Sequence, residues 1–206
     1  LENKIYLISL LIISILLSYL IVKNFEYNFL INSILISSAL YLFFMNLRDF
    51  FIHKSKNISQ NISHFGFSLL ILSILFNNLF STEIITNLKV GETFESSKTK
   101  IVFENVSKRE GKNYESIVGN FNIQNSKGKI ENFLPELRIY NQPNIVTSEA
   151  DIKTTLISDK FIVINLVQNQ DYFNIRYQVK PFMIWIWFSV VLISFGGLIS
   201  LVKKRI

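Results

Sequence analysis

The segment ISHFGFSLLILSILFNNLF, residues 62–80, decides the fold because it is a nearly continuous apolar run with a histidine near its start. A helix of this length, with a rise of about 1.5 Å per residue, would be roughly 28 Å long, close to the hydrocarbon thickness of a bilayer. The segment therefore predicts a membrane-spanning helix. A histidine inside such a helix is costly unless its imidazole has a partner, so His64 is the first candidate functional residue.

The composition also indicates a membrane protein. The 206-residue chain is 50% hydrophobic and only 17% charged, whereas soluble domains usually carry about 25% charged residues. Its net charge of +6 does not indicate a nucleic-acid partner, because the basic residues are scattered over polar loops or flank apolar runs. The absence of cysteine excludes disulfides, thiolate metal sites and a Cys-x-x-Cys-His motif within this chain. Because residue 1 is Leu, we expect a fragment of a longer protein, a split-gene product or an unusual start codon.

Four apolar runs define the expected topology. Residues 1–80 should form three transmembrane helices, at about 5–22, 29–47 and 62–80, and residues 181–206 should form a fourth helix with a basic tail. The polar loop Arg48–Asn61 and the C-terminal tail gather Lys and Arg, as cytoplasmic segments do. This charge pattern places the N-terminus in the cytoplasm, or in the matrix of a mitochondrion, and His64 in the inner half of the membrane.

Residues 81–180 have the pattern of a small β domain on the opposite, external side of the membrane, which is the periplasm in a bacterium. Apolar residues alternate with polar ones in several short runs, and residues 125–128 and 168–171 have the composition of hairpin turns. We expect six to eight strands and no helix here. The predicted fold class is α+β: four transmembrane helices, with a small antiparallel barrel or sandwich inserted between the third and the fourth.

His64 has two readings that the residues alone leave open. It is either an interfacial histidine with its ring among the lipid headgroups, or a functional group that binds a metal or haem iron or relays protons. Gly66 would reduce bulk beside a flat porphyrin. The only other histidine, His53, lies in the basic loop and is expected to be solvated. The helical face of His64 is expected to continue through Phe67, Ser68, Ile71 and Leu75 as a mostly apolar wall.

Other residues give weaker signals. Trp185 and Trp187 begin the fourth span, where an aromatic belt is usual, although they would also suit stacking on haem or a partner helix. Glu136 and Arg138 would share a strand face as an exposed ion pair. No paired carboxylates, nucleophile triad, phosphate loop or zinc site can be assembled from the chain. The candidate contacts with a partner or with haem are therefore Trp185, Trp187, Arg138 and Tyr140.

Several landmarks, in order, are similar to one family. They are His64-Phe-Gly66, Gly111-Lys-Asn-Tyr114, Pro135-Glu-Leu-Arg-Ile-Tyr140, Ser148-Glu-Ala150, Asp159-Lys-Phe-Ile-Val163, Arg176-Tyr-Gln-Val-Lys-Pro181, Trp185-Ile-Trp187 and Gly196-Gly197. From about residue 60 to 206 the chain resembles the C-terminal portion of the cytochrome c maturation haem lyase subunit, the CcmF family. Two departures are Lys112, where the family has a proline, and Leu137, where it has a lysine; they make a role for those two positions doubtful.

The resemblance implies a function. The family takes haem from a haem chaperone and, with thioreductase-like partner subunits, attaches it to apocytochrome c. It also carries a haem b in the membrane between two histidines, proposed to keep the delivered haem reduced. His64 matches the more C-terminal of these axial ligands, and the other belongs to the family's upstream half. The chain alone is therefore not expected to perform ligation.

The resemblance also implies a location, and two rival functions remain. The location is the bacterial inner membrane, or the mitochondrial inner membrane. The first rival is a non-enzymatic, membrane-anchored scaffold whose β domain binds partners. The second is a transporter subunit, which is disfavoured by the lack of midplane charges and broken helices.

Overall fold

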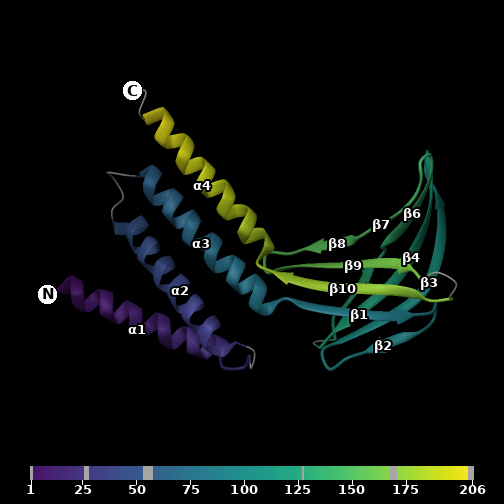
Figure 1. Cartoon of the computed structure of the whole chain (residues 1–206), viewed down its shortest axis with the longest axis horizontal. Coiled ribbons are helices and arrows are strands. Elements are labelled where there is room, and N and C mark those ends of the chain that lie inside the picture. Colours follow the sequence, from purple (N-terminus) through teal and green to yellow (C-terminus); the bar gives the residue numbers. More distant parts are fainter. Residues whose placement is uncertain (1, 26–27, 53–57, 127, 168–170, 204–206) are drawn as a thin grey trace. The chain divides into compact units, whose positions relative to one another are not determined.

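A computed structural model describes residues 2–25, 28–52, 58–126, 128–167 and 171–203. Contacts divide the chain into two compact units, Leu1–Phe80 with Pro181–Ile206, and Ser81–Lys180. The first unit is helical and the second is built of strands (Figure 1).

The described residues of the helical unit form four helices, each long and apolar enough to cross a membrane. They are α1 (Glu2–Val22), α2 (Phe29–Ile52), α3 (Ile58–Phe80) and α4 (Met183–Lys203). The four predicted spans are therefore confirmed as helices. They form because each apolar run is long enough for five or more turns and contains no proline.

The predicted polar loop at residues 48–61 was too long. In the structure α2 continues through Arg48 and Asp49, and α3 begins at Ile58. Both extensions have polar partners: the Arg48 guanidinium lies 4.8 Å from the centre of the Tyr6 ring, and the Asn61 side chain donates to the Asp49 carbonyl at 3.2 Å. Because these polar side chains have partners, α2 and α3 can extend into the segment predicted as a loop. His53 lies outside the described residues.

Helices α3 and α4 pack closely through small residues. The Ser59 hydroxyl donates to the Gly196 carbonyl at 2.8 Å, and the Ser63 hydroxyl donates to the Ile193 carbonyl at 3.4 Å. A Cβ added to Gly196 would lie 2.8 Å from the Ser59 carbonyl oxygen, so only glycine allows this approach. Such small-residue contacts are typical of helix pairs in membranes, where close packing replaces the hydrophobic effect.

The β unit consists of two antiparallel sheets. One has the order β1-β10-β9-β8, and the other has the order β2-β3-β4-β6-β7 with β5 paired to β4. Two sheets settle the barrel-or-sandwich alternative in favour of a sandwich, and the ten strands formed by the described residues exceed the predicted six to eight. The strands are β1 (Thr82–Leu88), β2 (Thr93–Glu95), β3 (Thr99–Glu110), β4 (Tyr114–Asn125), β5 (Ile130–Phe133), β6 (Glu136–Asn141), β7 (Asn144–Glu149), β8 (Asp151–Thr154), β9 (Ser158–Leu166) and β10 (Phe173–Pro181).

Both sheets contribute to one core. Phe103 and Phe121, from neighbouring strands, are fully buried and stack with ring centroids 4.3 Å apart. Ile162 and Ile164 of β9 and Ile175 of β10 contribute from the other sheet and are also fully buried. Alternate residues of these strands face the core, as the period of two predicts.

A largely buried ion pair joins the two sheets. The Lys160 ammonium of β9 lies 2.6 Å from the Glu131 carboxylate of β5, and the two side chains are 19% and 14% exposed. Burial alone would raise the pKa of Glu131, but hydrogen bonds from Lys160 and Lys129 outweigh it, so the net shift of that pKa is downward. Burial, with a smaller contribution from the Glu131 charge, raises the pKa of Tyr177 to about 12.

Each of the two predicted hairpin turns lies partly outside the described residues. Lys127 of the turn predicted at 125–128 lies outside the described residues, but the Gly128 amide donates to the Asn125 carbonyl at 2.9 Å and Gly128 has a φ of 78°, as in a hairpin turn. This backbone conformation favours glycine. Residues 168–170 of the other turn lie outside the described residues.

Candidate functional site

His64 lies in the second turn of α3 with its side chain exposed. It belongs to a stripe of exposed positions three, four or seven residues apart, which makes them one helical face. We call this set the open face of α3: Gln60, His64, Phe67, Ile74 and Asn78.

The other faces of α3 are occupied by neighbouring helices. Phe65 lies between Phe43 and Phe50 of α2, with ring centroids 5.6 Å from each. Ser63 and Gly66 face α4, where a Cβ on Gly66 would meet Ile193 and Leu192 atoms at 3.0 Å. Gly66 therefore serves helix packing, and the interpretation that it makes room for a porphyrin was wrong.

The wall predicted around His64 is only partly present. Phe67 is 53% exposed and shares the open face with His64. Ser68 is buried, and its hydroxyl donates to the Phe65 carbonyl at 2.9 Å. Leu75 packs against the core shared by α1, α2 and α3. The apolar surface beside His64 is thus narrower than the sequence suggested.

Within the described parts of the chain, the His64 imidazole makes no hydrogen bond and no ion pair. Those parts also contain no group of three or more His, Cys, Asp or Glu side chains that could hold a metal ion. Among the described residues, both ring nitrogens of His64 are therefore uncommitted.

Trp185 and Trp187 lie in the first turns of α4 and do not meet His64. Trp187 is 65% exposed, and Trp185 is 37% exposed and contacts Phe188 edge-on with ring centroids 6.0 Å apart. Ser63 and Gly66, which flank His64, contact residues 193–196 of α4. Both tryptophans therefore lie six or more residues along α4 from the part of that helix beside His64. This corresponds to at least about 9 Å along the helix.

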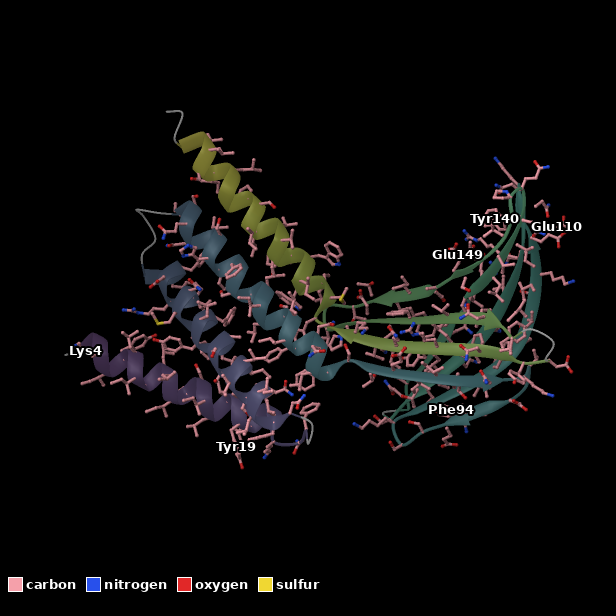
Figure 2. All side chains as sticks on the ribbon, in the orientation of Figure 1. Lys4, Tyr19, Phe94, Glu110, Tyr140 and Glu149 are labelled. Atoms are coloured by element: carbon pink, nitrogen blue, oxygen red, sulfur yellow. The ribbon has the colours of Figure 1, made fainter. Side chains whose placement is uncertain are left out.

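Arg138 and Tyr140 lie in a surface cluster of the β unit. The Arg138 Nε lies 3.2 Å from the Glu136 carboxylate, and its guanidinium lies 4.9 Å from the centre of the Tyr114 ring. Tyr114 and Tyr140 are ring neighbours at 5.3 Å, and Glu149 of β7 lies 3.9 Å from Arg138 (Tyr140 and Glu149 are labelled in Figure 2). Three landmarks that are far apart in the sequence therefore converge on one guanidinium.

A cavity that sequence reasoning missed lies in the helical unit at the far end of α3. It has a volume of about 640 Å³, and the described residues that line it are uncharged, with four asparagines among apolar side chains. Asn78 belongs to this lining and lies fourteen residues from His64, or about 21 Å along the helix. Only the asparagine-rich link between the first two spans could have indicated it. The lining residues are Asn24, Phe25, Asn28, Asn32, Leu35, Ile36, Leu75, Asn78 and Leu79.

Comparisons with known proteins agree with this architecture. Residues 79–181 match the family model described as the CcmF C-terminal beta-sandwich. The chain is 25% identical over 146 residues to the cytochrome c-type biogenesis protein CcmF of Pseudomonas aeruginosa, covering 71% of this chain and 22% of that protein. It is 32% identical over 123 residues to the cytochrome c-type biogenesis protein ccl1 of Rhodobacter capsulatus, covering 60% and 19%.

A solved structure shows the same fold over most of the chain. The structure titled cytochrome c heme lyase CcmF superposes with a TM-score of 0.70 at 17% identity, covering 96% of this chain and 34% of that one. The chain spans about a fifth of the length of the curated relatives it matches. The family match over the β unit and the fold match over both units lead to one conclusion: this chain belongs to the CcmF family.

Proposed function

We propose that this chain is the C-terminal part of a haem lyase subunit of cytochrome c biogenesis, and that His64 is an axial ligand of a haem b within the membrane. The observation that carries the proposal is the uncommitted His64 imidazole on the open face of α3, a helix able to span the bilayer. An imidazole held against lipid at this depth would be costly, whereas iron coordination gives one ring nitrogen a partner.

The open face suits a flat, apolar cofactor at one end of α3. Phe67 lies one turn from His64 on the same face and offers an exposed aromatic surface. The other faces of α3 are filled by α2 and α4, so a ligand can approach His64 only from the open face. When bound, the haem would supply an iron centre able to carry one electron.

The second axial ligand belongs, in this proposal, to a segment outside these residues. The curated relatives are about five times longer than the stretch they share with this chain. A neighbouring helix that carries the other histidine would cover the open face and bury the imidazole. Haem attachment to apocytochrome c is accordingly proposed for the complete protein and not for this chain alone.

The β unit is proposed to dock the partner subunits or the haem chaperone on the outer side of the membrane. The proposed orientation follows from Lys and Arg clustering at the ends of the spans away from the β unit. Arg138 and its aromatic neighbours are the proposed contact, because Arg and Tyr dominate protein interfaces. Cross-links from the intact complex that never reach residues 81–180 would contradict this role.

Haem content of the purified complete complex tests the ligand assignment. His64→Ala should lose the membrane haem b, whereas the matched control His53→Ala should retain it. Full haem b with an unchanged low-spin spectrum in His64→Ala would contradict the ligand assignment. The second candidate function, a scaffold that only binds partners, predicts no haem with this chain and tolerance of the His64 substitution.

A further inference from the structure

The turn between β8 and β9 places two large apolar residues at its apex. Leu156 and Ile157 are each 71% exposed, more than any other large apolar residue described in the β unit. Central positions of turns are usually filled by Gly, Pro, Asn, Asp or Ser. Two branched aliphatic residues at these positions are therefore not explained by turn chemistry.

The turn is closed by polar groups and does not need the two apolar side chains. The Thr155 amide donates to the Ser158 carbonyl at 3.0 Å, and the Thr155 hydroxyl donates to the same carbonyl at 2.8 Å. The same hydroxyl accepts from the Ser158 amide at 3.0 Å. Leu156 and Ile157 are thus held outward on an ordered hairpin, and residues 154–158 carry no charge. We call residues 154–158 the apolar tip.

The sheet topology places the apolar tip at one particular end of the β unit. β9 and β10 are hydrogen-bonded neighbours joined by six residues, which is too short for a parallel crossover. They therefore run in opposite directions, as their arrows do in Figure 1. Both strands are nine residues long, so the start of β9 lies level with the end of β10.

That end of the sheet is tied to the membrane helices by the chain itself. β10 ends at Pro181 and α4 begins at Met183, while α3 ends at Phe80 and the β10-paired strand β1 begins at Thr82. A single residue spans at most about 3.6 Å. The apolar tip therefore extends beyond the strand ends from which the chain enters two spanning helices.

We propose that the apolar tip inserts into the interfacial layer of the lipid bilayer and anchors the β unit to the membrane surface at a third point. Two of the anchoring points are the covalent links to α3 and α4. The third is the pair of aliphatic side chains of Leu156 and Ile157. Apolar groups at membrane interfaces reach about 5–10 Å into the boundary between headgroups and acyl chains.

Single-cysteine labelling tests the insertion, because these 206 residues contain no cysteine. Leu156→Cys would be introduced into the intact membrane protein, with any cysteines elsewhere replaced, and labelled with an environment-sensitive fluorophore in nanodiscs of phosphatidylcholine and phosphatidylglycerol. The matched control is Val90→Cys, which is 50% exposed in the turn after β1. That turn lies at the opposite end of the same sheet, seven strand residues away, or more than about 20 Å.

The label at position 156 should emit at shorter wavelength than the label at position 90. It should also be quenched by a nitroxide near the top of the lipid acyl chain more than by one near its end. Emission typical of water would overturn the proposal. Short-wavelength emission without lipid quenching would overturn it as well, because it would mean that protein covers the tip. The outcome is independent of haem content, so it can fail while the proposed function holds.

Discussion

The close approach of α3 and α4 predicts opposite outcomes for two adjacent glycines. A Cβ on Gly196 would lie 2.8 Å from the Ser59 carbonyl oxygen and 2.9 Å from the Ser63 amide nitrogen, and closer still to the Ser63 hydroxyl. A Cβ on Gly197 would meet nothing within 4 Å among the described residues. Gly196→Ala therefore forces the helices apart, whereas Gly197→Ala has space.

The magnitude follows from what Gly196→Ala disrupts. The Ser63 hydroxyl can rotate away, but the two backbone atoms cannot, so overpacking should cost about 1–3 kcal/mol. Separating the helices also weakens the Ser59 to Gly196 hydrogen bond, 2.8 Å long, and such bonds within membranes contribute about 0.6 kcal/mol. Both variants gain the same helix propensity from alanine, up to about 1 kcal/mol, so this gain cancels when they are compared. Gly196→Ala should be less stable than Gly197→Ala by about 2–4 kcal/mol.

Unfolding by SDS in mixed micelles measures this difference. Fluorescence is a suitable probe because the two tryptophans of the chain, Trp185 and Trp187, both lie on α4. Equal midpoints for the two variants, or a lower midpoint for Gly197→Ala, would refute the packing argument. A result in the expected direction would also mean that α4 fixes which face of α3 remains open.

Two further predictions concern the β unit. Phe121→Leu should lower the free energy of urea unfolding by about 1–3 kcal/mol, because it removes the ring stacked on Phe103 and leaves a partial cavity; an unchanged midpoint would contradict the shared core. Glu131→Gln should cost about 2–3 kcal/mol at neutral pH, because Lys160 would keep its charge at 19% exposure without a counter-ion. Since the folded-state pKa of Glu131 is lowered, its stabilisation is complete above the unfolded pKa of about 4.3 and is lost as pH falls through the folded value. The deficit of Glu131→Gln relative to the wild type should therefore shrink below about pH 4 in the same urea titrations, and a constant deficit down to pH 2 would contradict this origin.

The spanning helices could be predicted from the sequence because the signal is local. Each contains a long uncharged run without proline, and composition alone identifies it. Their ends could not be predicted as well, because Arg48 remains helical through a contact with Tyr6 more than forty residues away. Contacts between helices do not appear in a local hydropathy pattern.

The β unit shows the same limit. Alternation located the strands, but β5 and β8, of four residues each, are too short to stand out from their surroundings. The convergence of Tyr114, Arg138 and Glu149 depends on strand pairing, which no local pattern encodes. The order of the landmarks in the sequence indicated the family without indicating that three of them meet.

The identity of the candidate ligand was accessible from the sequence, but its surroundings were not. His64 stands out because histidine is rare in an apolar run. The packing of α2 and α4 determines which face of α3 remains open. Gly66 faces α4, whereas His64 is exposed. The sequence predicted Ser68 on the same face as His64, but Ser68 is buried. Periodicity shows which residues share a helical face and does not show which neighbour covers that face.

The central claim is that the His64 imidazole coordinates haem iron, and chemical rescue of His64→Gly in the complete complex tests it most directly. Removing the side chain should abolish the low-spin spectrum of the membrane haem b. Added imidazole should restore that spectrum by occupying the vacated position. Retention of the low-spin spectrum in His64→Gly without imidazole would contradict the claim.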